Sequence, residues 1–184
     1  MSSVKIMGLD LSLTSTGVCV AGKPFAINSK NKGTKRLVEI SERILTTAVL
    51  ENPHAIMLEG YSFGSKFSRA HSIGELGGAV KAILYKSGYA VVDIPPTCRA
   101  KFATGKGNAS KTEVMLSILE FTKIEFLGSA ADDLCDAWVL EQMGLAKLGL
   151  SQYEWPKIQM SALDKVDWNP LLQILDKKVV SNGS

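Results

Sequence analysis

Three short apolar segments lie close together at the start of the chain, and they constrain its fold more than any other feature. Strands are predicted over residues 4–10 (VKIMGLD), 17–21 (GVCVA) and 24–28 (PFAIN). The connections between them are short and turn-like, as in SLTST at residues 12–16. Three strands joined in this way predict an antiparallel meander at one side of a sheet.

Helical and strand-like patterns alternate after the meander. A helix is predicted from Thr34, as its N-cap, through about Glu51. Its apolar residues recur at helical spacing: Leu37, Ile40, Ile44, Leu45 and Ala48. The stretch HAIMLEG predicts a buried strand that ends at Glu59, and YAVVDIPP predicts another that is stopped by Pro95 and Pro96.

Three more helices complete the pattern, over about residues 73–87, after Ser110, and over about 132–148. Ser110 and Glu113 have the spacing of a capping box, and Asp132 is the natural N-cap of the last helix. The basic stretch between Pro96 and Ser110 is interpreted as a loop. The order predicts an α/β fold with a mixed five-stranded sheet, a meander plus parallel strands, flanked by helices.

Length and composition place few further limits on the chain. The 184 residues are 46% hydrophobic and 21% charged, as expected of one globular domain. No apolar run approaches the roughly 20 residues needed to span a bilayer, and no signal peptide is recognisable, so we expect a cytoplasmic protein without membrane contact. Three widely spaced cysteines indicate neither a disulfide framework nor a zinc site of the CxxC type.

Charge is distributed unevenly along the chain. Residues 61–112 contain eight basic and two acidic side chains, whereas residues 113–144 contain one lysine and seven acids. A basic segment beside an acidic cluster suits a polyanion that is held against metal ions. A solvated surface that happens to be uneven is the alternative.

Four carboxylates fall where predicted elements meet the same end of the sheet. Asp10 ends the first strand, Glu59 ends the fourth, and Asp133 and Asp136 lie one turn apart on the last helix. If the four converge, their repulsion requires divalent cations such as Mg²⁺ or Mn²⁺. Each also has a purely structural interpretation, as a turn cap, an exposed strand end or a favourable charge in a first helical turn.

Lys111 is the next candidate. If Ser110 is the N-cap, Lys111 lies in the first helical turn, where the positive end of the helix disfavours a cation. An anion bound at this position would relieve the conflict. An exposed lysine with a small energetic cost is the alternative.

The motifs GLDLSLTSTGV, IMLEGYSFG, GKGNASKTEV and ADDLCDAWVL resemble, in order and spacing, those of RuvC-type Holliday-junction resolvases of the RNase H-like nuclease superfamily. The resemblance extends over roughly Val4 to Gly144. It implies a Mg²⁺-dependent crossover junction endodeoxyribonuclease, with Mn²⁺ as a substitute metal. Asp10, Glu59, Asp133 and Asp136 match the ligands of two metal ions, and Lys111 matches the catalytic lysine. Asp132 is not among the matching ligands.

The resemblance also implies contacts with branched DNA. Aromatics of the loop after Glu59, namely Tyr61, Phe63 and Phe67, compete for a role in stacking on junction bases, and they could instead close over the core. Basic residues expected to contact DNA are Lys66, Arg69, Lys101 and Lys106. The segment GELGGAV resembles the helix through which these enzymes form homodimers, and nothing in the sequence identifies a branch-migration motor as a partner.

Other functions remain open. They are a different RNase H-like nuclease, such as one that cleaves RNA–DNA hybrids, and a junction-binding relative without catalysis. A sugar-kinase or actin-like ATPase is disfavoured, because those proteins need two such domains to enclose a nucleotide. We expect the nuclease domain to comprise residues 1–149, followed by an extension over residues 150–184 that packs either on the domain or on a partner.

Overall fold

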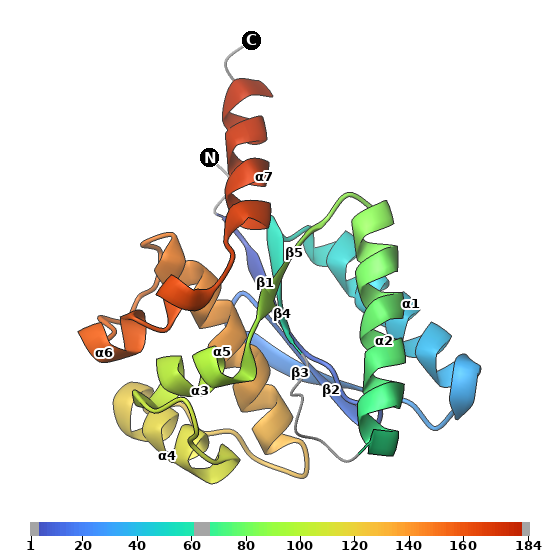
Figure 1. Cartoon of the computed structure of the whole chain (residues 1–184), viewed down its shortest axis with the longest axis horizontal. Helices are drawn as coiled ribbons and strands as arrows, with labels where there is room; N and C mark the ends of the chain where they lie inside the picture. Colours follow the sequence, from blue (N-terminus) through green and yellow to red (C-terminus); the bar gives the residue numbers. More distant parts are fainter. Residues whose placement is uncertain (1–3, 61–66, 182–184) are drawn as a thin grey trace.

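The computed structural model describes residues 4–60 and 67–181, which form a five-stranded sheet with helices on both faces (Figure 1). The strands are β1 (Ile6–Asp10), β2 (Ser15–Val20), β3 (Lys23–Asn28), β4 (Ala55–Glu59) and β5 (Ala90–Ile94). Their order in the sheet is β3-β2-β1-β4-β5. β1 pairs antiparallel with β2 and parallel with β4, and β4 pairs parallel with β5. The predicted mixed sheet is therefore confirmed.

Helices cover the sheet in two layers. They are α1 (Gly33–Glu51), α2 (Phe67–Lys86), α3 (Pro96–Thr104), α4 (Lys111–Thr122), α5 (Ala131–Lys147), α6 (Lys157–Met160) and α7 (Asn169–Ser181), with a 3₁₀ turn η1 (Leu163–Lys165). α1 and α2 cover one face, whereas α3, α4 and α5 lie on the other (Figure 1). Each face has its own buried apolar cluster.

The alternation of side chains along the central strands decides which face the carboxylates occupy. Met7 and Leu9 of β1 belong to the cluster under α1 and α2, and Ile6 belongs to the cluster under α5. Asp10 has the same parity as Ile6, so it faces α5. In β4, Met57 is buried on the α5 side, and Glu59 follows the same parity. Because β1 and β4 are parallel, Asp10 and Glu59 end their strands at the same edge of the sheet.

Two of the predicted N-caps, those of α1 and α5, differ from the structure. The apolar face predicted for α1 is packed against the core, but the N-cap is Lys32 rather than Thr34. α4 begins as expected, with both hydrogen bonds of the capping box between Ser110 and Glu113. α5 has Ala130 as its N-cap, so the assignment of Asp132 to that position was wrong. Asp132 lies one residue inside the helix, where its carboxylate accepts a hydrogen bond from a lysine of α4.

The basic segment after β5 is not the loop that was predicted. Residues 96–104 form α3, so Lys101 lies in a helix. Pro96 was interpreted only as the end of a strand, yet proline is also well suited to the first position of a helix. α3 ends at Gly105, whose φ of 83° is accessible to glycine without strain. α2 begins at Phe67 rather than at residue 73, which places Phe67 and Arg69 in a helix.

The segment after Gly149 packs against α3 and α5. Trp155, Leu163, Trp168 and Leu171 are buried in the same cluster as α3 and α5. The rings of Phe102 in α3 and Trp155 lie 4.3 Å apart between centroids. These contacts hold the segment against α3 and α5 as far as Leu171, and the division of the chain at residue 149 stays a prediction. No helix in the described part of the chain is long and apolar enough to cross a membrane.

Candidate functional site

Two glycines of the sheet, Gly8 and Gly17, allow α5 to approach more closely than would be possible with any other residue at these positions. A Cβ atom on Gly8 of β1 would lie 1.9 Å from the carbonyl oxygen of Ala137, and one on Gly17 of β2 would lie 2.1 Å from that of Asp133. Both oxygens belong to the backbone of α5 and cannot rotate away. The absence of these two Cβ atoms thus places the first turns of α5 directly over the ends of β1 and β2, where Asp10 lies.

Three of the four predicted metal ligands meet at this position. Asp10, Glu59 and Asp136 each offer a carboxylate oxygen within 4.8 Å of the others. Asp136 is only 2% exposed. Oxygen ligands of this kind suit hard divalent cations such as Mg²⁺ and Mn²⁺. The donor set therefore fits the metal that the sequence predicts.

The electrostatics of this cluster favour a bound cation. Burial raises the pKa of Asp10 well above its ordinary value, and the charges of Glu59 and Asp136 raise it further. Burial also raises the pKa of Asp136 to about 7, although Arg99 acts in the opposite direction. Ionised carboxylates in such surroundings are costly unless a positive charge compensates them. The cluster is therefore a strong candidate for a metal centre.

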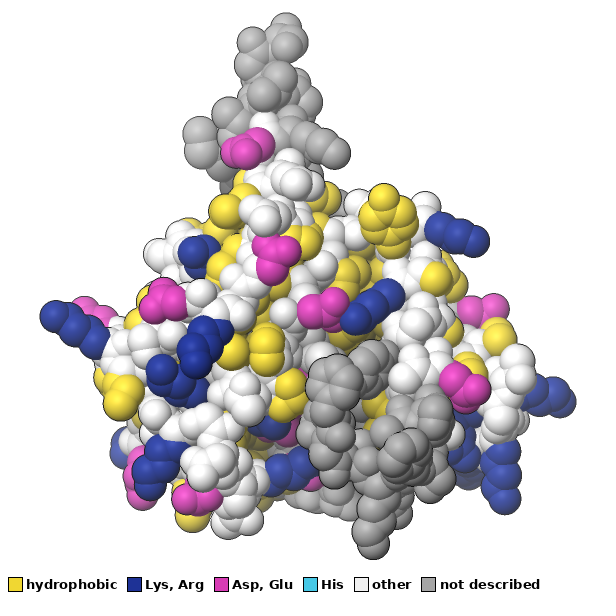
Figure 2. Space-filling view, in the orientation of Figure 1, with side chains coloured by type: hydrophobic (Ala, Val, Ile, Leu, Met, Phe, Trp, Pro, Cys, Tyr) yellow, Lys and Arg dark blue, Asp and Glu magenta, His cyan; other side chains and the backbone are white. Residues whose placement is uncertain are grey.

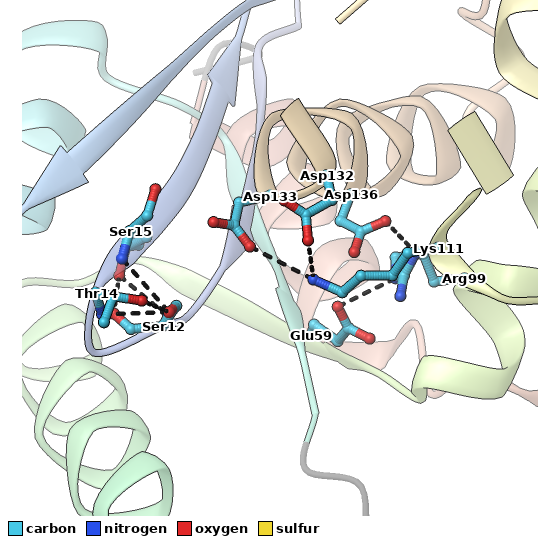
Figure 3. A network of polar contacts seen from close by, with 10 residues as sticks. Ser12, Thr14, Ser15, Glu59, Arg99, Lys111, Asp132, Asp133 and Asp136 are labelled. Atoms are coloured by element: carbon cyan, nitrogen blue, oxygen red, sulfur yellow. Dashed lines mark hydrogen bonds and ion pairs between the residues drawn. The ribbon is translucent and has the colours of Figure 1, made fainter. Parts of the chain in front are cut away.

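Asp133 is oriented differently, toward Lys111 (Figure 3). The Nζ atom of Lys111 lies 2.6 Å from Asp132 Oδ2 and 3.6 Å from Asp133 Oδ1. These partners, with the nearby charges of Asp136 and Asp10, raise the pKa of Lys111 despite its partial burial. The anion expected beside the first turn of α4 is therefore supplied by the carboxylates of α5. Asp133 lies next to the cluster without belonging to the group of three that the described residues form.

Arg99 completes the site, although it is not among the residues predicted from the sequence. Its Nε donates a hydrogen bond to Glu59 Oε2 at 3.1 Å, and its Nη1 donates to Asp136 Oδ1. The side chain comes from α3 and is nearly buried, with 7% of the residue exposed (Figure 3). Burial lowers its pKa, but the adjacent carboxylates reverse this and raise it, so Arg99 is a permanent cation. Pro96 is the signal that could have revealed Arg99, because a helix that begins at Pro96 includes this arginine.

The residues predicted to contact DNA have different positions. Lys101 lies half-buried in α3, and Lys106 is exposed in the connection between α3 and α4. Arg69 lies in α2, whereas Tyr61, Phe63 and Lys66 are outside the described residues. Figure 2 shows Lys and Arg side chains, interspersed with acidic ones, on the face of the molecule over α3 and α6.

Comparison with known proteins supports the same family. A search against models of protein families found no match. The curated crossover junction endodeoxyribonuclease RuvC of Carboxydothermus hydrogenoformans is 26% identical over 156 residues, which cover 79% of this chain and 98% of that protein. The sequence resemblance thus extends over nearly the whole of a RuvC protein.

Solved structures agree with this relationship at the level of the fold. RuvC of Thermus thermophilus has a TM-score of 0.63 and 22% identity, covering 82% of this chain and 100% of that chain. The same protein in complex with a Holliday junction substrate has a TM-score of 0.62. The yeast mitochondrial Holliday junction resolvase Ydc2 has a TM-score of 0.54 and 16% identity, covering 88% of this chain and 80% of that chain. The resemblance predicted from the motifs is thereby confirmed: the chain is similar in sequence to a RuvC protein and shares the fold of RuvC-type Holliday junction resolvases.

Proposed function

We propose that this chain is a metal-dependent endonuclease that resolves four-way DNA junctions by hydrolysing phosphodiester bonds in strands of like polarity. The observation that carries the proposal is the convergence of Asp10, Glu59 and Asp136 at one edge of the sheet. The RuvC relative, 98% of which is covered, supports the choice of branched DNA over other polyanions.

Asp10, Glu59, Asp133 and Asp136 would hold two Mg²⁺ ions, for which Mn²⁺ would substitute. When bound, such ions supply an activated water and stabilise the leaving oxygen of a phosphodiester. Asp133 lies between the carboxylate cluster and Lys111, so it would complete the set of ligands. The proposed products are a 5′-phosphate and a 3′-hydroxyl.

Lys111 would act on the scissile phosphate. Its ammonium group is half-exposed and already lies beside the carboxylates of α5. A phosphate that enters the site would compete with Asp132 for this charge, because both are anions within reach of the same side chain. Lys111 would thereby neutralise charge that develops on the phosphate during in-line attack.

The remaining predicted contacts concern the arms and the centre of the junction. Lys101 and Lys106 would bind backbone phosphates, which supply affinity without sequence information. Lys66 and Arg69 would do the same, and Tyr61 and Phe63 would stack on unpaired bases.

Two copies of the chain would act together, one on each of two strands. The predicted dimer helix is α2, in which Gly78 is exposed and has no atom within 4 Å of the position of a Cβ. A surface of this kind would allow a helix of a second copy to approach closely.

A cleavage assay with three substrates tests the function. Purified protein is incubated with a synthetic four-way junction, a linear duplex and an RNA–DNA hybrid, with Mg²⁺, Mn²⁺ or EDTA. We expect cleavage of the junction alone, and only with a divalent metal. Equal or faster cleavage of the hybrid would instead identify a ribonuclease, the second candidate from the sequence.

Asp136→Asn separates catalysis from binding. We expect it to abolish cleavage while junction binding persists, because the amide removes a buried negative charge from the ligand cluster. Asp164→Asn is the matched control, since Asp164 is exposed in η1. Retained cleavage by Asp136→Asn would contradict the assignment of the metal ligands.

A further inference from the structure

Arg99 uses the same oxygen atoms that a metal ion would need. It pairs with Glu59 Oε2 and Asp136 Oδ1, and both residues belong to the three-carboxylate group. The side chains of the pair Arg99 and Asp136 are 9% and 3% exposed, so water screens their attraction weakly. A guanidinium group with several donors in a rigid plane is well suited to bridge two carboxylates.

Arg99 and Lys111 together compensate the negative charge of the carboxylates. Asp10, Glu59 and Asp136 offer carboxylate oxygens within 4.8 Å of one another, and like charges at such a distance repel each other. Arg99 compensates Glu59 and Asp136 from α3, and Lys111 compensates Asp132 and Asp133 from α4. Arg99 and Lys111 therefore each pair with two of the carboxylates. Arg99, the more buried of the two, lies at the candidate metal position.

We infer that Arg99 is a positioning residue that holds Glu59 and Asp136 together in the metal-free protein and competes with divalent cations for these two carboxylates. Asp10, which has no hydrogen bond to Arg99 among the described contacts, offers the first oxygen to an incoming ion. Full coordination by Glu59 and Asp136 then requires the guanidinium to give up one or both contacts. The affinity for metal is thus set by the strength of this pairing. The inference rests on one part of the proposed function, the binding of metal by the carboxylate cluster, and does not require DNA cleavage.

Arg99→Gln tests the competition in the absence of DNA. Mn²⁺ binding to protein first treated with EDTA is measured by titration with detection of free Mn²⁺ by electron paramagnetic resonance. We expect the variant to bind Mn²⁺ at least about tenfold more tightly, because a buried positive charge next to the ion has been removed. We also expect its melting temperature to fall in EDTA and to recover with Mn²⁺ more than that of the wild type.

Arg43→Gln is the matched control, because Arg43 is exposed on α1, where it pairs with Glu39 at 4.0 Å and donates a hydrogen bond to the carbonyl oxygen of Asn28 at 2.7 Å, without contact to the carboxylate cluster. It should leave the Mn²⁺ affinity and the recovery of the melting temperature with Mn²⁺ unchanged. Arg99→Lys is the second variant, to be used if Arg99→Gln does not fold. Lysine keeps the positive charge but cannot bridge two carboxylates as a guanidinium does. The Arg99→Lys variant should therefore bind Mn²⁺ more tightly than the wild type.

The outcomes separate this inference from the proposed function. Tighter Mn²⁺ binding by the Arg99 variants supports the competition, even if the wild type cleaves no junction. Mn²⁺ affinity that is unchanged or weaker in the variants overturns the competition and leaves the nuclease proposal standing. If neither the wild type nor the variants bind Mn²⁺, both the metal centre and the competition are overturned.

Discussion

The replacement Gly8→Ala tests whether the close contact between α5 and the sheet determines the geometry of the site. The new Cβ would lie 1.9 Å from the carbonyl oxygen of Ala137 and 2.7 Å from the amide nitrogen of Glu141. Both atoms belong to helix backbone. An ordinary contact begins near 3.4 Å, so α5 and β1 must separate by about 1.5 Å for the methyl group to fit.

Such a separation affects stability and the site together. Overpacking of this kind costs about 1–3 kcal/mol or more, because neither backbone can yield without moving its neighbours. Asp136 moves with α5, whereas Asp10 stays with β1. A displacement of about 1 Å between groups that act together can cost about 100-fold in activity. We therefore expect Gly8→Ala to lower both the free energy of unfolding and the affinity for Mn²⁺.

Urea unfolding followed by tryptophan fluorescence measures the first effect, and the Mn²⁺ titration measures the second. Thr46→Ala on α1 is the control, since Thr46 is exposed and α1 packs on the face of the sheet opposite α5. That change should alter the free energy of unfolding by no more than about 0.5 kcal/mol and leave the Mn²⁺ affinity unchanged. If Gly8→Ala stayed within about 0.5 kcal/mol of the wild type and bound Mn²⁺ normally, the idea that this contact fixes the ligand spacing would be refuted.

Three further predictions concern the electrostatics and the C-terminal segment. Burial raises the pKa of Asp136 from 3.8 to about 7, so its ionisation opposes folding. The metal-free protein should therefore lose stability as pH rises from about 4 to about 7, and Asp136→Asn should reduce this slope in urea unfolding at a series of pH values. Asp132→Asn removes the 2.6 Å contact with Lys111 but changes stability by less than about 1 kcal/mol, since the pair is partly exposed. Its cleavage rate should fall far less than that of Asp136→Asn, and an equal loss would place Asp132 among the ligands. Trp155→Ala should cost about 3–5 kcal/mol in urea unfolding, because it empties a buried position against Phe102, and a cost below 1 kcal/mol would contradict that packing.

The carboxylate cluster could be predicted because it depends on simple periodicities. Alternation along β1 and β4 places Asp10 and Glu59 on one face, and the parallel pairing of these strands places them at one edge. Asp136 follows from the one-turn spacing on α5. The positions of these three carboxylates depend on the periodicity within each element and on the order of the strands. Both can be inferred from the pattern of residues.

Arg99 and the pairing of Lys111 could not be predicted in the same way. α3 is a nine-residue helix with five buried residues, so it lacks the amphipathic pattern that marks a surface helix. Which carboxylate Lys111 contacts depends on the distance between α4 and α5, which tertiary packing sets. Likewise, the prolines and aromatics around Trp155 and Trp168 have no period from which burial could be inferred.

The position of β1 in the sheet has a consequence for biosynthesis. β1 precedes the other four strands in the sequence and lies at the centre of the sheet, whereas α5, which packs on one of its faces, follows all five strands. A nascent chain therefore exposes Asp10 for most of translation without Arg99 or Asp136 nearby. The last pieces of that face, Trp155 to Leu171, are added after every residue of the candidate site. Contacts between such distant parts of a chain form slowly. Assembly of the candidate metal centre is thus expected to be a late event in folding.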